Sequence, residues 1–593
     1  MDNISGIYNE PLKSTRSGSL FMAFSYPTKI SPETIALYIL AHTKPNDIVL
    51  DVFGGSGSLG LAALLCDTPN QKLLELIAES KLKVKFGPRK AFVNEISGLG
   101  SFISIVMSSK IDSKNFSLQA SKLLQRTIKR IDRTYKTVDP EGNDGEIRYV
   151  IHSEYLICPH CKNETSFSDA CVSTSPLEIK SNWTCTTCNS LNLTANSERV
   201  LEKVYDPILN QERIIRKRRP YKIYGQTGKI KWKRFAIESD FNSSSLKQVY
   251  YKDMVPVHKL NWGDLHRSGY HFGIDYLHDF YTERNIAVMS ILWDEVSNAP
   301  LRYQDSLKLW ILSYNASHST LMTRVVLKKN QSDFILTGAQ PGVLYISSLP
   351  VEKNIIKGLE RKIKTFNDAF SLVERSNSEV ITNWGSSTNL DIQDESVNYV
   401  FTDPPFGDYI PYSELNILNE VWLNRLTNIK EEAIISKSQN KTTADYESLL
   451  TSVFSEVNRV LVEDGNVSVV FHSASSDVWN ALKNTFSNTH FEVINSSILQ
   501  KDQASFKQTN SQTIVKGDAV LLLNKGNSIQ KEKLTEEELL NKLITEARLK
   551  NNKLELERER LYSRYVGFCM KNHIPLVFGA KEFYSKIELM IAG

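Results

Sequence analysis

No apolar run in this chain of 593 residues approaches the roughly 18 residues that a membrane-spanning helix needs. The first residues, MDNISGIYNEPLKSTRSG, also lack the apolar core of a secretory signal peptide. We therefore expect a cytoplasmic protein without a membrane partner. Hydrophobic residues make up 41% of the sequence and charged residues 23%, so neither a disordered chain nor a fibrous repeat is indicated.

The sequence also lacks a strong net charge. Its formal charge of +4 at pH 7 is too small to identify a partner, so the distribution of charge matters more than the sum. The length exceeds what a single hydrophobic core usually holds and predicts roughly two to four domains. No pattern in the sequence indicates an oligomeric state.

Cysteine is scarce and unevenly distributed. Four of the seven cysteines form two pairs, CPHC at 158–161 and CTTC at 185–188, with 23 residues between them. In a reducing compartment such pairs indicate a metal site rather than disulfides. Four thiolates close a tetrahedral shell around a structural Zn²⁺ ion and leave no open position for catalysis. The predicted zinc ligands are Cys158, Cys161, Cys185 and Cys188, whereas Cys171 and His160 are interpreted as bystanders.

A glycine-rich turn follows a predicted strand near the amino terminus. Residues 47–60 read DIVLDVFGGSGSLG, and such a turn lets the backbone approach a bound nucleotide closely. No Gly-Lys-Ser/Thr sequence follows, so the spacing is not that of a phosphate-binding loop. The next predicted strand, 90–95, ends in Glu95, and an acidic side chain in that place can accept both hydroxyls of a ribose.

A helix start precedes the glycine-rich turn. In YPTKISPETIALYILAHT (26–43) we expect Ser31 to cap a helix and Pro32 to occupy its first position. Without a ligand, Lys29 would be a solvated lysine at the end of a loop.

The stretch TDPPFGDYI, residues 402–410, directly follows the apolar run VNYVF. Two adjacent prolines cannot donate to a strand ladder, so the chain must leave the sheet as a stiff loop. We expect this loop to present its side chains, including an exposed Phe406, at the carboxyl edge of the strands, where ligands bind in open α/β sheets. The structural alternative is a rigid turn before a helix.

Together these motifs resemble a known family. DVFGGSG resembles the S-adenosylmethionine-binding motif of the amino-group DNA methyltransferases, TDPPF their catalytic motif, and YPTKISPE the motif that precedes the glycine loop in permuted members. Most of residues 10–525 is similar to the adenine-specific DNA methylases with a zinc ribbon in a long central insertion. The resemblance implies an α/β fold: a Rossmann-like methyltransferase sheet with an inserted zinc-ribbon and recognition region and a helical carboxyl-terminal tail.

The resemblance also implies roles for individual residues. The Asp403 carboxylate and the Pro404 carbonyl would accept the hydrogens of a target amine, and Phe406 would stack on a base flipped out of the duplex. Aspartate before Pro-Pro leans toward adenine N6 rather than cytosine N4. The catalytic residues are then Asp403, Pro404, Pro405 and Phe406, and the cofactor residues are Thr28, Lys29, Asp51, Phe53, Gly54, Gly55, Gly57 and Glu95.

The order of the motifs predicts four parts. Residues 1–110 and 366–527 would form the methyltransferase domain, 111–365 the inserted zinc-ribbon and target-recognition region, and 528–593 a helical extension. We expect that extension to be a long surface or partner-binding helix, with a capping box at Thr535 and Glu538.

The basic strip, which we define as residues 213–235, contains ten lysines and arginines, no acid and four aromatic residues. This mixture predicts nucleic-acid contact, because cations neutralise phosphates and aromatic rings stack on bases. The alternative is a solvated β-ribbon. Four histidines beyond the strip are interpreted as core or surface residues rather than ligands: His258, His266, His271 and His278.

The resulting hypothesis is an S-adenosylmethionine-dependent methyltransferase that acts on adenine N6 in double-stranded DNA. Similar enzymes often serve restriction-modification or phage defence. No nuclease constellation is recognisable, so cleavage would require a separate restriction or defence subunit. Two alternatives stay open: an RNA base methyltransferase, and a catalytically silent DNA-binding subunit.

Overall fold

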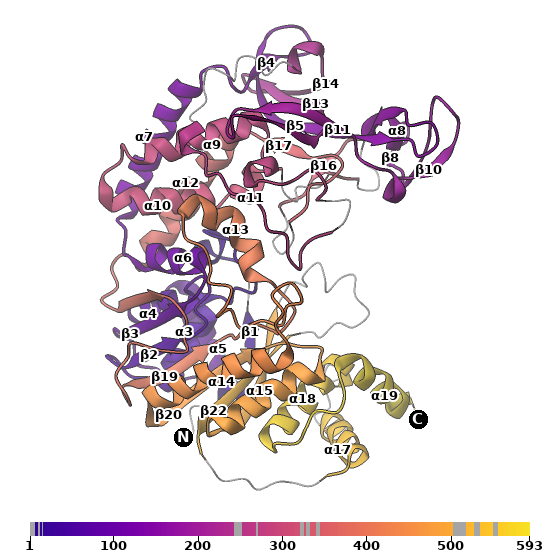
Figure 1. Ribbon diagram of the computed structural model, residues 1–593. Coiled ribbons are helices and arrows are strands. Elements are labelled where there is room, and N and C mark those ends of the chain that lie inside the picture. Colours follow the sequence, from indigo (N-terminus) through magenta and orange to yellow (C-terminus); the bar gives the residue numbers. More distant parts are fainter. Residues whose placement is uncertain are drawn as a thin grey trace.

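The structure is a computed structural model (Figure 1). It describes residues 6–9, 12–14, 16–241, 252–267, 271–320, 325–327, 332–339, 344–501, 517–526, 534–549 and 556–592. No helix within these ranges is both long enough and apolar enough to span a bilayer.

An eight-stranded sheet forms the centre of the fold, with the strand order β1-β21-β22-β20-β19-β2-β3-β18. All of these strands run parallel except β22, which is antiparallel to both of its neighbours. This arrangement confirms the predicted α/β methyltransferase-like sheet. The strands are β1 (Leu12–Ser14), β2 (Ile48–Asp51), β3 (Lys90–Glu95), β18 (Glu379–Trp384), β19 (Val397–Thr402), β20 (Leu461–Phe471), β21 (Phe491–Lys501) and β22 (Asp518–Lys525).

The chain order along the sheet reverses between β2 and β19. From β2 the chain continues to β3 and β18 on one side, whereas β19 leads to β20 on the other. Open α/β sheets bind ligands at such a switch point, outside the carboxyl ends of the strands. The glycine-rich turn follows β2 and the TDPPF loop follows β19, so both lie at this position.

Helices cover both faces of the sheet, because alternate strand residues point to opposite sides. Tyr399 and Phe401 pack into one hydrophobic cluster, and Val400 packs into the other. The first cluster includes α3 (Pro32–His42), α4 (Ser58–Asp67) and α6 (Gly98–Ser108), and the second includes α14 (Thr443–Val460) and α15 (Ser476–Asn488).

Helix α3 begins as predicted but is not capped as predicted. Ser31 is the N-cap residue and Pro32 is the first helical residue. The Ser31 hydroxyl makes no capping hydrogen bond and donates instead to the carboxylate of Glu33. The prediction of a side-chain cap was therefore wrong, since a nearby buried carboxylate competes for the hydroxyl.

The insertion between α6 and β18 is built on a layer of helices and a second sheet (Figure 1). The second sheet has the order β14-β13-β5-β17. Its strands are β5 (Asp144–Ile157), β13 (Arg218–Thr227), β14 (Ile230–Phe235) and β17 (Val351–Lys353). The helical layer consists of α7 (Ser113–Ile131), α9 (Glu283–Val296), α10 (Leu301–Leu312) and α12 (Ile355–Val373).

The carboxyl-terminal extension differs from the expected long surface helix. It contains α17 (Glu536–Leu549), α18 (Arg558–Lys571) and α19 (Ala580–Ala592), and its apolar side chains join the second hydrophobic cluster. The leucines at helical spacing are buried, since a continuous apolar stripe is more stable against the sheet than in water. The Thr535–Glu538 capping box is present, with the Thr535 amide 2.7 Å from a carboxylate oxygen of Glu538. The predicted boundary at 527/528 lies outside the described residues.

Gly57, in the glycine-rich turn, is required by helix packing. Its φ is +77°, and a Cβ atom there would lie 2.7 Å from the Cα of Ser104 on α6. We expect Gly57→Ala to destabilise the protein by about 2–4 kcal/mol, combining left-handed backbone strain with overpacking. Thermal denaturation of the variant against wild type checks this.

Gly228→Ala is the matched control. Gly228 also has a positive φ, +59°, but a Cβ atom there would meet no atom of the described residues within 4 Å. Equal losses of melting temperature in the two variants would show that the contact with Ser104 contributes nothing.

Candidate functional site

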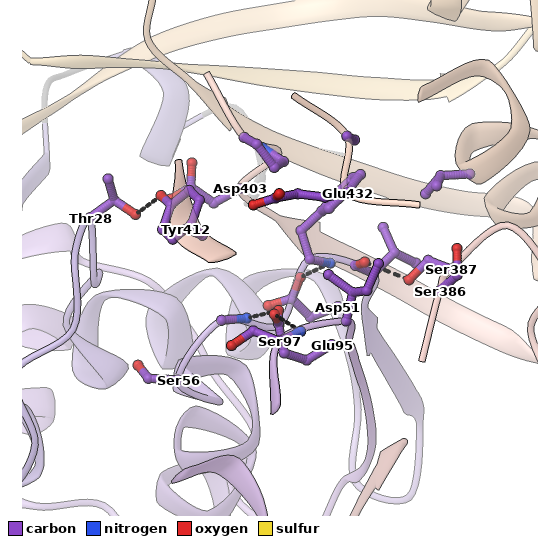
Figure 2. Close-up of a pocket in the computed structure, with 18 of the residues that line it drawn as sticks. Thr28, Asp51, Ser56, Glu95, Ser97, Ser386, Ser387, Asp403, Tyr412 and Glu432 are labelled. Carbon is purple, nitrogen blue, oxygen red and sulfur yellow. Dashed lines mark hydrogen bonds between the residues drawn. The ribbon is translucent and has the colours of Figure 1, made fainter. Parts of the chain in front are cut away.

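A pocket of about 1030 Å³, part of it open to solvent, lies at the switch point of the sheet (Figure 2). The glycine-rich turn and the TDPPF loop both line it. Of the predicted cofactor and catalytic residues, the lining includes Thr28, Lys29, Asp51, Phe53, Gly54, Gly55, Glu95, Asp403 and Pro405. Gly57, Pro404 and Phe406 do not line it.

Glu95 organises the glycine-rich turn. One of its carboxylate oxygens accepts the Gly55 amide at 2.6 Å, and the other accepts the Ser97 amide at 2.7 Å. Each oxygen has a second lone pair, so the carboxylate can still accept hydroxyls from a ligand. Burial raises the pKa of the Glu95 carboxyl to about 8.

Asp51 connects the two loops of the pocket. Its Oδ1 atom accepts the Phe53 amide at 3.0 Å and the Thr402 hydroxyl at 2.8 Å. Thr402 is the last residue of β19, so this bond joins the ends of the two central strands. Burial raises the pKa of the Asp51 carboxyl to about 7.

Thr28 and Lys29 reach the pocket from the segment before α3. The Thr28 and Tyr412 hydroxyls lie 2.9 Å apart, as Figure 2 shows. The Lys29 ammonium instead donates to backbone carbonyls, at 3.0 Å to Leu20 and 3.4 Å to Phe21. Burial lowers the pKa of Lys29 to about 7. Lys29 thus fixes the preceding chain segment. It is not the solvated lysine that the sequence offered as an alternative, and its ammonium points at backbone carbonyls rather than freely at a ligand.

Phe406 is buried, so the expectation of an exposed ring was wrong. Its side chain is 7% exposed and packs edge-to-face on Phe471, with the ring centroids 5.4 Å apart. His472 and Tyr409 complete this aromatic group, at centroid distances of 5.9 and 6.4 Å. An apolar slot beside the loop therefore holds the ring in this conformation, while Asp403 faces the pocket.

Several lining residues were not identified from the sequence. Tyr26 and Tyr412 stack with their centroids 6.2 Å apart, and the Ser387 hydroxyl donates to the Val52 carbonyl at 2.6 Å. The loop that holds Ser387 follows β18, and its serines carry no recognisable motif. Glu432 lies beyond α13 (Tyr412–Leu423) and accepts the amide and the hydroxyl of Ser413. No local pattern marks Glu432 as a pocket residue.

The pocket is strongly acidic. Among the described residues that line it, Lys29 is the only cation, and its ammonium is occupied by backbone carbonyls. Such a concave, partly desolvated site has a negative potential and favours a positively charged ligand. The lining acids are Asp51, Glu95, Asp403, Glu431 and Glu432.

The four cysteines predicted as ligands lie together in the insertion. Their sulfur atoms are all within 4.8 Å of one another, and the pairs Cys158–Cys188 and Cys161–Cys185 are 3.7 and 3.6 Å apart. Tetrahedral Zn²⁺ with Zn–S bonds of about 2.3 Å requires sulfur–sulfur distances of about 3.8 Å. The cluster therefore has the geometry of a zinc site with a closed shell.

The two cysteine pairs sit on matching turns. The Cys158 amide donates to the Asn163 carbonyl and the Cys185 amide to the Ser190 carbonyl, both at 2.9 Å. Both turns pass through a residue of positive φ, Lys162 at +61° and Asn189 at +56°. The ribbon carries α8 (Phe167–Cys171), β8 (Leu177–Ile179) and β10 (Leu191–Leu193), and in Figure 1 it lies far from strands β2 and β19, whose loops line the pocket. A structural role agrees with this distance.

The basic strip is largely neutralised by acidic side chains. Eight of its ten cations are within 4.0 Å of a carboxylate oxygen, and Lys229 and Lys231 are the two without such a partner in the described part of the chain. Its aromatic residues are partly structural too, since Tyr224 is buried and stacks on Tyr149. The strip therefore forms paired strands held by ion pairs rather than a continuous positive surface.

Comparison with known proteins gives one family match. Residues 3–68 match N6_N4_Mtase, described as DNA methylase. No curated protein matches the chain. A solved structure described as the antibiotic-resistance methyltransferase Kmr is 12% identical over 27% of this chain and 66% of that one, with a TM-score of 0.16. A TM-score this low does not establish a structural relationship.

The amino-terminal segment matches the N6/N4 DNA methylases. That segment contains α3, β2 and the glycine-rich turn, which form one wall of the pocket. The family implies S-adenosylmethionine as the cofactor and DNA as the substrate. The acidic lining fits this cofactor, because its sulfonium and amino groups are positive and its ribose hydroxyls need acceptors such as Glu95.

Metal analysis tests the cysteine cluster. We expect purified protein to contain about one zinc ion per chain and Cys161→Ser to lose it, because three thiolates bind more weakly than four. Cofactor binding should survive in the variant, since the cluster is remote from the pocket.

Cys171→Ser is the control, because Cys171 is buried in the same region but is not part of the cluster. Equal zinc loss in both variants would mean that the four ligands are assigned wrongly.

Proposed function

We propose that this protein is an S-adenosylmethionine-dependent DNA methyltransferase that methylates the N6 amine of a flipped adenine. The supporting observation is that Asp403 and the glycine-rich turn line one pocket, although they are far apart in the sequence. The resemblance of the sequence motifs to the zinc-ribbon adenine-specific DNA methylases supports this activity and a role in restriction-modification or phage defence.

Asp403 would activate the target amine. An exocyclic amine is a poor nucleophile, because its lone pair is delocalised into the ring. If the Asp403 carboxylate and the Pro404 carbonyl accept its two hydrogens, the nitrogen becomes more tetrahedral and its lone pair points at the electrophile. S-adenosylmethionine supplies that electrophile as a sulfonium-bound methyl group. Much of the acceleration then comes from alignment, which can contribute several kcal/mol.

Phe406 would hold the base by stacking. Flipping a base costs a few kcal/mol, and stacking on an aromatic ring returns roughly 1–3 kcal/mol. Because Phe406 packs on Phe471 in this conformation, base binding would require the ring to expose one face. The apolar slot beside the loop supports this role by limiting the positions that the Phe406 ring can take.

The remaining predicted residues would bind the cofactor. Glu95 would accept ribose hydroxyls, and Asp51 would interact with the positive end of the molecule. The backbone of the glycine-rich turn would lie against the nucleoside, and Thr28 would contact the methionine end. Lys29 would act through the chain segment that it holds, given its bonds to carbonyls.

The insertion would read the DNA target. We propose the division into 1–110 and 366–527 for methyl transfer, 111–365 for the zinc ribbon and recognition, and 528–593 for the extension. Exposed residues at the β13–β14 hairpin, including Lys229, Lys231 and Phe235, are candidates for duplex contact. Any nuclease activity would reside on a separate defence subunit.

Cofactor affinity should depend on pH. The raised pKa of Glu95, about 8, and of Asp51, about 7, mean that these acids keep protons that the unfolded chain loses from about pH 4 upward. Their contribution to stability is therefore present at low pH and lost as the pH rises through 7 to 8. A cationic ligand prefers the ionised carboxylates, so the dissociation constant should fall about tenfold between pH 6 and pH 8.

Calorimetry of wild type and Glu95→Gln measures this dependence. The ligand's own amino group titrates equally in both, so the difference between the two profiles reports Glu95. A wild-type profile no steeper than that of the variant would contradict the assignment.

Nucleoside mass spectrometry tests the activity. Purified protein with S-adenosylmethionine should produce N6-methyladenine in unmethylated genomic DNA, and Asp403→Ala should lower the yield by about 100-fold or more, since activation and alignment are both lost. The variant should retain cofactor binding.

RNA incubated in parallel distinguishes the alternatives. Methylation of RNA alone would change the substrate class, and N4-methylcytosine would change the base. Cofactor binding without any methylated product would favour a catalytically silent subunit.

A further inference from the structure

A buried tyrosine on α14 holds the TDPPF loop from outside the pocket. Tyr446 is fully buried, and its hydroxyl donates to the Pro405 carbonyl oxygen at 2.6 Å. The Gly407 amide donates to the same oxygen at 3.0 Å. Tyr446 does not line the pocket, whereas Leu449 and Val453 of the same helix do. The hydroxyl therefore reaches the loop without being able to contact a ligand in the pocket.

This hydrogen bond matters because the prolines of the loop cannot donate backbone hydrogen bonds. Pro404 and Pro405 have no amide hydrogen, so two backbone donors that could fix a loop are missing. The carbonyl of Pro405 is thus one of the few groups through which neighbouring elements can hold the backbone. The bond is partly buried, so its loss leaves the carbonyl less satisfied.

A second hydrogen bond fixes the other end of the same short segment. The Thr402 hydroxyl donates to Asp51 at 2.8 Å, which fixes the end of β19 against the end of β2. Asp403 and Pro404 lie between Thr402 and Pro405. Their backbone is therefore held on one side by the sheet and on the other by α14.

We propose that Tyr446 is a positioning residue for methyl transfer, which fixes the Asp403 carboxylate and the Pro404 carbonyl in the geometry that the target amine needs. This inference rests on the proposed function of the pocket. Tyr446 acts through the Pro405 carbonyl and takes no part in the chemistry. Burial raises the pKa of the Tyr446 hydroxyl well above its ordinary value, so it remains a donor at working pH.

The substitution Tyr446→Phe removes only the hydroxyl oxygen. We expect kcat on unmethylated genomic DNA to fall about 10- to 100-fold, because a displacement of about 1 Å at reacting groups has an effect of that size. The KM values for DNA and S-adenosylmethionine should stay within about twofold of wild type, since the cofactor wall is untouched. Steady-state and single-turnover kinetics of the full chain measure this split.

Tyr399→Phe is the matched control. Tyr399 is also fully buried, and its hydroxyl donates to Ser468 at 2.6 Å, away from the loop. It should lose stability comparable to that of Tyr446→Phe but keep its kcat. The proposal is overturned if the two variants have the same kcat, or if cofactor affinity falls in parallel with kcat in Tyr446→Phe.

Hydrogen exchange separates this proposal from the proposed function. Amides of residues 406–410 should exchange faster in Tyr446→Phe than in Tyr399→Phe, with the rest of the sheet unchanged. If wild type forms no methylated product, the proposed function fails, and with it the catalytic consequence proposed for Tyr446. Unchanged exchange over 406–410 overturns the proposal even in an active enzyme, because the loop would then not depend on Tyr446.

Discussion

The pairing of β2 with β19 is the constraint on which the pocket depends. Val49 is in register with Tyr399, and Leu50 with Val400. This parallel register brings two loops to the same edge of the sheet, and the hydrogen bond from Thr402 to Asp51 connects residues 351 positions apart in sequence. A one-residue slip would turn the alternating side chains to the wrong faces, so both hydrophobic clusters also fix the register.

The same topology explains how a large insertion is tolerated. The chain leaves after α6 and returns at β18, which is an edge strand of the sheet, so the insertion interrupts no strand pair. It nevertheless contacts the segment that follows the TDPPF loop, because the Glu414 carboxylate on α13 accepts the amides of Asp264 and Leu265 at 2.7 and 2.9 Å. Gly263 allows this approach, since a Cβ there would lie 2.5 Å from a Glu414 oxygen. The insertion is thus fixed to the helix that follows the TDPPF loop.

Local sequence patterns correctly predicted the features that depend on residues close together in the chain. The motifs lie at the ends of strands as expected, and the two cysteine pairs meet because each forms the same tight turn. The Ser31 cap failed because of Glu33, two residues further on, whereas the remaining differences depend on partners that are distant in sequence. The charge of the basic strip is reduced by such partners, since Arg213 pairs with Asp279, and Lys222 and Lys233 share Asp333; its predicted contact with nucleic acid stays a prediction. The position of Phe406 likewise depends on Phe471, which no motif links to it.

Glutamates hold the loops around the pocket. Glu95 accepts amides from two loops, and Glu414 accepts two neighbouring amides of the insertion. Glu420 accepts the Leu99 and Thr427 amides at 3.2 and 2.8 Å. Each bond is charge-assisted only when its carboxyl is ionised, and then contributes roughly 1.5–3 kcal/mol.

Burial nevertheless raises the pKa of all three carboxyls, so desolvation outweighs the stabilisation of the charged forms by the amides. Glu95 is the one of the three that lines the pocket. A cationic cofactor would offset the cost of its charge and stabilise the glycine-rich turn in its binding conformation. Glu95 would thus both shape the glycine-rich turn and attract a positively charged ligand. Cofactor binding would therefore stabilise the site.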